Sequence, residues 1–295
     1  MQNTPSRTAR HVALFRALES VRRGPRLFAD PYAASSLGPG YRAAVALARY
    51  SGLTNVLERR IDRSWPAGPR ASAVVRTRLI DDLVRDALDG DVRQLVLLGA
   101  GYDSRAFRLE AARTATVFEV DHPATQAAKR ALVASWNRNG TGRPHDDIRF
   151  VPADLMRQDL GEALRDAGLR DEPAVVVWEG VTNYLDASSV HTTLTALATT
   201  TAPGSRIVFT YMDRRALDGT GGFAGVEAWA EGVRAAGEPF TFGFLPDELP
   251  GYLGARGLAL TLDLSARDAA VRYLEPLGRH EPAAPFYRIA QAEVK

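Results

Sequence analysis

The sequence predicts an α/β fold with a doubly wound, mostly parallel sheet of seven strands. Short apolar segments alternate with helix-like segments along most of the chain, which is typical of parallel strands joined by right-handed crossovers. A glycine turn, Gly99-Ala100-Gly101, follows the first apolar run, and an acidic residue, Asp121, ends the second. A glycine turn and a carboxylate in these two places indicate a nucleotide-type binding site where the strands end.

Seven short apolar segments are predicted as strands, because uninterrupted runs of this length are typical of strands buried on both faces. They are 95–98, 117–120, 148–151, 174–178, 206–211, 258–264 and 286–290, of which the last can run antiparallel. Helices are predicted over 72–89, from 103 onward, and over 122–137, 157–167, 188–200 and 246–255. This order places a helix between most successive strands, so the strands should be mainly parallel.

Residues 1–70 precede the first predicted strand and are expected to form helices with breaks. Helical spacing predicts a helix over 11–23, which Gly24-Pro25 ends. A second helix should begin with Asp30 as N-cap and Pro31 as first residue, and breaks are expected at 38–40 and 65–69. We expect region 1–70 to be a helical cap or lid on a core of residues 71–295, or else a set of simple packing helices.

The composition is that of an ordinary soluble globular protein of 295 residues, 45% of them apolar and 24% charged. The net charge is only +2 and no segment concentrates basic residues, which gives no case for nucleic acid binding. The chain has no cysteine, so thiolate chemistry is excluded, and no metal site is predicted. The N-terminus is too polar for a signal peptide, and no apolar run approaches the roughly 20 residues of a membrane helix. We expect a cytoplasmic protein.

The glycine turn leaves the identity of the cofactor open. Glycine lets a backbone approach a ligand closely, and a helix N-terminus offers unpaired N–H groups. A dinucleotide fingerprint requires a third glycine three residues after the second, but this position is Ser104. The serine weakens the prediction of NAD without excluding it.

Five motifs occur in order at natural spacing: VRTRLIDD (75–82), LVLLGAGYDSRAFRL (95–109), VFEVDHP (117–123), the pair Asp154-Leu155, and VWEGVTNYL (177–185). With these motifs, and with LFADPYA near residue 30, the chain resembles class I S-adenosylmethionine-dependent methyltransferases, and among them the leucine carboxyl methyltransferase-like family. The resemblance implies a Rossmann-like class I methyltransferase core. It also implies S-adenosyl-L-methionine as the cofactor and S-adenosyl-L-homocysteine as its product.

The resemblance assigns the sugar and amino-acid parts of the cofactor to particular residues. Arg76 would pair with the methionine carboxylate, because a guanidinium binds a carboxylate with two parallel hydrogen bonds. Asp121, with His122 beside it, would hold the ribose hydroxyls, and Glu179 would lie near the methionine amino group. The alternatives are a solvated arginine, which we prefer for Arg78, and a helix cap for Glu179.

The remaining cofactor contacts implied by the resemblance are apolar or backbone contacts. Gly99, Ala100 and Gly101 would let the chain pass beside the cofactor. Asp154 would bond to the adenine and Leu155 would pack on it. The alternative for Asp154 is a simple turn residue.

The acceptor is predicted to be a carboxylate of a small-molecule natural product, with a phenol or hydroxyl of a secondary metabolite as the alternative. A sulfonium is an activated methyl donor, and an ionised carboxylate needs no general base, whereas a hydroxyl does. The chain has five histidines, none in a recognised base position, although His11 and His122 could approach the site. The lack of an obvious base favours the carboxylate.

The acceptor pocket is expected between the cap and an insertion at about 213–256, a segment rich in glycine and aromatic residues. Its predicted aromatic walls are Phe28, Tyr32, Trp229, Phe240 and Phe244, and the predicted positioning residues are Asn183, Tyr184 and Tyr211. The Thr-Asn of the segment 181–185 departs from the family pattern, which puts the acceptor's identity in doubt.

Two other functions remain open from the sequence. One is a nicotinamide-dependent oxidoreductase that uses the same glycine turn, and the other is a non-catalytic protein that retains the cofactor pocket. In each case we expect a small-molecule partner and neither nucleic acid nor membrane.

Overall fold

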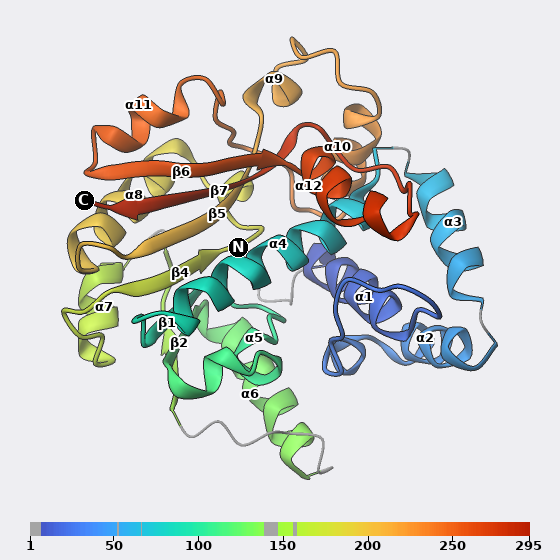
Figure 1. Cartoon of the computed structure of the whole chain (residues 1–295), viewed down its shortest axis with the longest axis horizontal. Helices are drawn as coiled ribbons and strands as arrows, with labels where there is room; N and C mark the ends of the chain where they lie inside the picture. Colours follow the sequence, from blue (N-terminus) through green and yellow to red (C-terminus); the bar gives the residue numbers. More distant parts are fainter. Residues whose placement is uncertain (1–6, 52, 66, 139–146, 156–157) are drawn as a thin grey trace.

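A seven-stranded sheet with helices on both faces forms the centre of the molecule (Figure 1). The computed structural model describes residues 7–51, 53–65, 67–138, 147–155 and 158–295. The strands are β1 (Gln94–Leu98), β2 (Thr116–Asp121), β3 (Ile148–Pro152), β4 (Ala174–Trp178), β5 (Arg206–Met212), β6 (Leu258–Ser265) and β7 (Tyr287–Val294). All seven predicted strands are present, with small shifts at their ends and a longer last strand.

The strand order is β3-β2-β1-β4-β5-β7-β6. Strands β3, β2, β1, β4 and β5 are parallel to their neighbours, whereas β7 pairs antiparallel with both β5 and β6. The predicted doubly wound, mostly parallel sheet is therefore confirmed. Strand order reverses between β1 and β4, and open α/β sheets bind ligands beside the carboxyl ends of the strands at such a point.

Each face of the sheet has its own apolar core, because successive strand residues point to opposite faces. Leu95 and Leu97 of β1 join one core, which packs under α4 (Pro69–Asp89), α6 (Pro123–Arg138) and α12 (Ala266–Tyr273). Val96 and Leu98 join the other, which packs under α7 (Leu160–Asp166), α8 (Ala187–Thr200) and α11 (Leu249–Gly254). This two-sided cover fixes the strand ends that form the site.

The connection from β1 to β2 differs from the prediction of a helix from residue 103. It contains only a four-residue helix, α5 (Arg105–Arg108), and a 3₁₀ turn, η2 (Ala111–Thr114). The side chains of Arg105 and Arg108 are drawn inward to Asp81, with N–O distances of 2.8 and 2.5 Å. This arrangement turns polar side chains toward the core, and the chain leaves the helix at Leu109 in an extended conformation.

The N-terminal region forms α1 (Arg7–Val21), a 3₁₀ turn η1 (Ala33–Ser36), α2 (Pro39–Ser51) and α3 (Thr54–Ser64) around a small apolar core of its own. The second predicted helix is only the turn η1, where the Asp30 carboxylate accepts the N–H groups of Tyr32 and Ala33 at 3.0 Å. The break predicted at 38–40 lies at residues 37–38, because Pro39 already begins α2, a position that suits the fixed φ of proline.

The segment between β5 and β6 contains two helices that were not predicted, α9 (Arg214–Leu217) and α10 (Val226–Ala235), in addition to α11. A Cβ atom on Gly232 of α10 would lie 2.1 Å from the Trp65 ring, so this glycine permits close packing between the insertion and the cap. No helix in the described ranges is long and apolar enough to cross a membrane.

Candidate functional site

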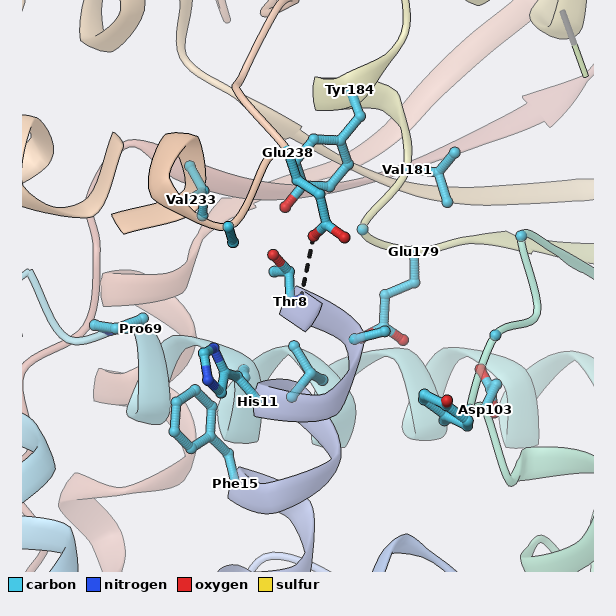
Figure 2. A pocket seen from close by; sticks show the side chains of 18 of the residues that line it. Thr8, His11, Phe15, Pro69, Asp103, Glu179, Val181, Tyr184, Val233 and Glu238 are labelled. Carbon is cyan, nitrogen blue, oxygen red and sulfur yellow. Dashed lines mark hydrogen bonds between the residues drawn. The ribbon is translucent and has the colours of Figure 1, made fainter. Parts of the chain in front are cut away.

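A cavity of about 790 Å³ lies above the carboxyl ends of the central strands, within the size range typical of ligand sites. The glycine turn and the residues after β2, β3 and β4 line one part, called here the glycine-turn end. Helix α1, α10 and the loop after α10 line the other, called here the aromatic end, whose walls include Tyr184, Trp229, Phe240 and Tyr287. Figure 2 shows side chains from α1 and from the loops after β1, β4 and α10 around this space.

The glycine turn is fixed by Asp121 at the end of β2. Its carboxylate accepts the Gly101 N–H at 2.5 Å and the His122 N–H at 2.6 Å. Burial raises the pKa of Asp121 above its ordinary value, while the two backbone N–H groups oppose that shift. Gly99 and Gly101 have φ angles of +61° and +41°, which glycine adopts readily. The carboxylate therefore holds the turn and also lines the cavity.

A close approach explains the first glycine of the turn. A Cβ atom at Gly99 would lie 2.5 Å from Cγ2 of Val181, in the loop after β4. Ala100 and Gly101 also line the cavity, together with His122, Asp154 and Leu155. The predicted backbone and adenine contacts are thus gathered at one end of the cavity.

An ion-pair cluster occupies the floor of the cavity beside β4. Arg76 Nε of α4 donates to Glu179 at 2.6 Å, and Arg105 Nη1 donates to the other carboxylate oxygen at 2.6 Å. Burial alone would raise the pKa of Glu179, but the two guanidinium groups outweigh it and hold this pKa below its usual value. Glu179 is thus an ionised acceptor of hydrogen bonds, which contradicts the helix-cap alternative.

Three members of this cluster were not predicted from the sequence. Arg105 also donates to Asp103 at 2.5 Å, and Tyr287 of β7 accepts from Arg76 Nη1 at 2.8 Å. Arg105 and Asp103 belong to the glycine-turn motif, so their place in the motif was a signal that could have been used. Tyr287 gave no such signal, because it is brought to the site by the antiparallel last strand.

The aromatic end contains three of the predicted acceptor residues. Tyr184, in the 3₁₀ turn η3 (Thr182–Tyr184), lies 5.7 Å from the Phe240 ring. Trp229 of α10 stacks on Tyr287 with 5.9 Å between ring centroids and an interplanar angle of 18°. These rings form an apolar wall of the cavity, and ligand sites are commonly lined by such aromatic side chains.

Five other predicted acceptor residues do not line the cavity, and these predictions are wrong. Phe28 and Tyr32 belong to the core under α4, where Tyr32 lies 4.6 Å from the Trp136 ring. Tyr211 and Phe244 belong to the core on the opposite face of the sheet. Asn183 is buried, and its backbone carbonyl accepts the N–H of Thr241 at 2.8 Å.

Tyr211 illustrates the physical reason for these errors. Its hydroxyl donates to Asp263 of β6 at 2.8 Å and accepts from Arg288 of β7 at 3.0 Å. The ring therefore points along the sheet toward its antiparallel edge and away from the cavity. A single sequence shows which segments are aromatic but not which way each ring faces.

Two polar residues line the aromatic end, and the sequence gave little or no signal for them. His11 of α1 lines the cavity, as the sequence had left open, and so does Glu238 in the loop after α10. The Glu238 carboxylate accepts the Thr8 N–H at 3.1 Å, across the space between the insertion and the cap (Figure 2). Of the remaining histidines, His122 lines the glycine-turn end, and His145 lies outside the described residues.

The residues of the cavity fit S-adenosyl-L-methionine. Gly99 and Gly101 line the cavity with backbone and no side chain, so a nucleoside can lie close to the turn. Asp121 offers a carboxylate for paired hydroxyls, and the cluster of Arg76, Glu179 and Asp103 offers both charges that an amino-acid tail needs. None of these residues requires a metal ion to contact the cofactor in this way.

The family model for leucine carboxyl methyltransferases matches residues 9–198 of the chain. A protein of Frankia alni assigned as an S-adenosyl-L-methionine-dependent methyltransferase is 34% identical over 274 residues, covering 92% of this chain and 87% of the relative. A Streptomyces coelicolor protein with the same assignment is 32% identical over 288 residues, covering 92% and 88%.

Among solved structures, a protein from Thermobifida fusca assigned as a methyltransferase has a TM-score of 0.61 at 18% identity, covering 99% of this chain and 96% of that chain. At this identity the likeness concerns the fold alone. The alternative prediction of an NAD-dependent oxidoreductase has no support from these comparisons. The chain belongs to the leucine carboxyl methyltransferase family and is an S-adenosyl-L-methionine-dependent methyltransferase.

Proposed function

We propose that the enzyme methylates an oxygen atom of a small, largely apolar molecule that binds at the aromatic end of the cavity. The observation that supports this most is the continuity of the cavity. One space of about 790 Å³ joins the glycine turn to the rings of Tyr184, Trp229 and Phe240. A cofactor at one end and an acceptor at the other would therefore meet without an intervening wall.

The cofactor-binding roles implied by the motifs form part of this proposal. Arg76 and Glu179 would hold the charged amino-acid tail, Asp121 the ribose, and Asp154 and Leu155 the adenine. When bound, S-adenosyl-L-methionine supplies a methyl group that is already activated by its sulfonium. The protein's own residues then have to align the acceptor oxygen and exclude water.

The cap is proposed to close the cavity from above. Helix α1 places Thr8, His11 and Phe15 on the wall that faces the insertion. The hydrogen bond from the Thr8 N–H to Glu238 joins the two elements that flank the aromatic end. Region 1–70 would therefore act as a lid and not only as packing for the core.

Two acceptor classes fit this proposal. The predicted carboxylate acceptor would give a methyl ester without a general base, and the alternative hydroxyl acceptor would give a methyl ether and release a proton. The family match names a carboxyl methyltransferase, which supports the first class. The polar residues at the aromatic end, among them Glu238, bear on the second class.

Calorimetry with S-adenosyl-L-homocysteine and with NAD tests the cofactor part of the proposal. We expect binding of the first compound and none of the second. A panel of aromatic acids and phenols, analysed by mass spectrometry for a gain of one methyl group, tests the acceptor part. Binding of S-adenosyl-L-homocysteine without methylation of any small molecule would count against a small-molecule acceptor.

A further inference from the structure

Glu238 brings a carboxylate to the end of the cavity that would receive the acceptor. It lies in the loop directly after α10 and lines the cavity together with Tyr184 and Phe240. Figure 2 shows its carboxylate directed toward the first turn of α1, between Tyr184 and Thr8. The residue is half-buried, so its charge is only partly screened by water.

The described walls of the cavity offer little positive charge to an anionic acceptor. Arg16 and Arg76 are the only lysine or arginine residues among the described residues that line it. Arg16 is paired with Asp30 at 3.3 Å and donates to the Tyr102 carbonyl at 2.6 Å. Arg76 is paired with Glu179. An acceptor carboxylate would therefore meet the negative charge of Glu238 without an arginine reserved for it.

We propose that Glu238 selects acceptors with a neutral hydroxyl group and takes up the hydroxyl proton during methyl transfer. This proposal rests on the proposed function. The acceptor oxygen forms its bond to the methyl carbon while the carbon–sulfur bond breaks and its electron pair remains on sulfur. The hydroxyl proton passes to the Glu238 carboxylate and later to water. The products are a methyl ether and S-adenosyl-L-homocysteine.

The chemistry of the neighbouring groups supports this assignment. A hydroxyl can donate to a carboxylate in a charge-assisted hydrogen bond, whereas two carboxylates at contact distance repel one another. Burial, with the added effect of Tyr287 and Glu238, raises the pKa of Tyr184 far above its ordinary value. Tyr184 therefore remains a neutral phenol and does not take up the proton, whereas Glu238 offers a carboxylate at this wall, which His11 also lines.

A purely structural role for Glu238 would be to hold the first turn of α1, where a carboxylate stabilises the exposed N–H groups of a helix. Glu238→Gln separates the two roles. A glutamine amide oxygen can still accept the Thr8 N–H but has no negative charge and cannot take up a proton. Glu231→Gln, on the exposed side of α10, is the matched control.

The experiment compares the full-length wild-type enzyme with both variants. The acceptors are 2-naphthol, 2-naphthoic acid and a nitrophenol that is ionised at the assay pH. Acceptor affinity is measured by calorimetry in the presence of S-adenosyl-L-homocysteine, and kcat/KM by mass spectrometry of the ether or ester. Binding of S-adenosyl-L-homocysteine to each variant is measured first, so that loss of the cofactor site is distinguished from a change at the acceptor site.

We expect the wild-type enzyme to bind naphthol at least about tenfold more tightly than naphthoate. In a partly buried site, the repulsion at short range between the Glu238 and naphthoate carboxylates costs more free energy than a tenfold difference in affinity represents. In Glu238→Gln, kcat/KM for naphthol should fall by about 10²-fold or more, as when a general base is lost. Affinity for naphthoate and for the ionised phenol should rise in the same variant. Glu231→Gln should behave as the wild-type enzyme does.

A crossover between neutral and anionic acceptors supports the proposal, since a structural role would change all acceptors alike. Equal losses for all three compounds, a wild-type preference for naphthoate, or failure of both naphthalenes to bind would each overturn it. If S-adenosyl-L-homocysteine does not bind the wild-type enzyme, the proposed function itself fails, independently of Glu238.

Discussion

Arg76 and Glu179 lie 103 positions apart in the chain, and their side chains meet in a 2.6 Å ion pair on the floor of the cavity. Helix α4 supplies the arginine and the end of β4 supplies the glutamate. The pair is tied further to Tyr287 and Arg105. An amino-acid tail that binds here meets charges whose positions are already set, which reduces the entropy lost on binding.

Substitution of Arg76 by lysine should weaken binding of S-adenosyl-L-homocysteine by about 1.5–3 kcal/mol, the typical value of a hydrogen bond to a charged group. Lysine keeps the charge but cannot contact Glu179 and Tyr287 with a planar fork. Calorimetry measures the change. Arg78→Lys is the control, because Arg78 lies on the same helix, pairs with Asp82 and does not line the cavity. Equal affinities for all three proteins would remove Arg76 from the binding site.

Asp121→Asn should weaken binding of S-adenosyl-L-homocysteine by about 1–3 kcal/mol, because an amide offers the ribose hydroxyls no negative charge. In the wild-type enzyme, affinity for S-adenosyl-L-homocysteine should fall as the pH is lowered, and the fall should begin at a higher pH than for an ordinary aspartate. Burial raises the pKa of Asp121, and protonation removes its carboxylate as a hydrogen-bond acceptor. Calorimetric titrations at several pH values test both effects. Asp171→Asn, in the exposed loop before β4, should leave the affinity unchanged.

Trp229→Ala should raise the KM of the acceptor and leave the affinity for S-adenosyl-L-homocysteine unchanged, because Trp229 lines only the aromatic end. Phe244→Leu provides the contrast. Phe244 is buried in the core beside Tyr252, with ring centroids 4.9 Å apart, so its truncation should lower the free energy of unfolding by about 1–3 kcal/mol without changing KM. Steady-state kinetics and denaturant unfolding measure the two effects. A changed KM in Phe244→Leu would contradict its assignment to the core.

Glu119 should make the stability of the fold depend on pH. This buried residue of β2 is paired with Lys129 at 2.7 Å, and burial raises its pKa to about 7 against the opposing effect of the lysine. The folded state therefore binds the proton more tightly than the unfolded state, so stability is full below the unfolded pKa and falls as pH rises toward 7. Each unit of pKa shift corresponds to about 1.4 kcal/mol.

Glu119→Gln should flatten this pH dependence between the unfolded pKa and pH 7. The free energy of unfolding of both proteins is measured by chemical unfolding at pH 4.5, 6 and 7.5. These pH values roughly span the interval between the unfolded and folded pKa values of Glu119. Stability of the wild-type protein that rises through this interval more steeply than that of the variant would contradict the sign of the predicted effect.

The sequence predicted the sheet and the glycine-turn end of the site well, because both depend on local patterns. Val175, Val176 and Val177 leave little choice for β4, and the spacing of Gly101 and Asp121 is set by one turn and one strand. Four of the five family motifs lie at strand ends and the fifth lies on α4, and residues of all five are found together around one cavity.

The aromatic end was predicted less well, because it is assembled from distant segments whose orientation depends on packing. The glycine-rich composition of the insertion gave no sign of a helix, whereas Gly232 lies within α10 and makes room for the Trp65 ring. Tyr32 suggested a pocket wall in the cap, whereas Phe107 and Trp136 surround it. Glu238 had no local pattern at all, and only the tertiary structure brings it opposite α1.

The position at which a dinucleotide fingerprint would have its third glycine has another use in this chain. The Ser104 hydroxyl donates to the Asp30 carboxylate at 2.7 Å, and Arg16 of α1 pairs with the same carboxylate. The segment that follows the glycine turn is thereby joined to the N-terminal region through the buried Asp30, in addition to the hydrogen bond from Arg16 to the Tyr102 carbonyl. A chimera that exchanges the first 70 residues between two relatives should consequently exchange Ser104 as well, so that the hydrogen bond to Asp30 is kept.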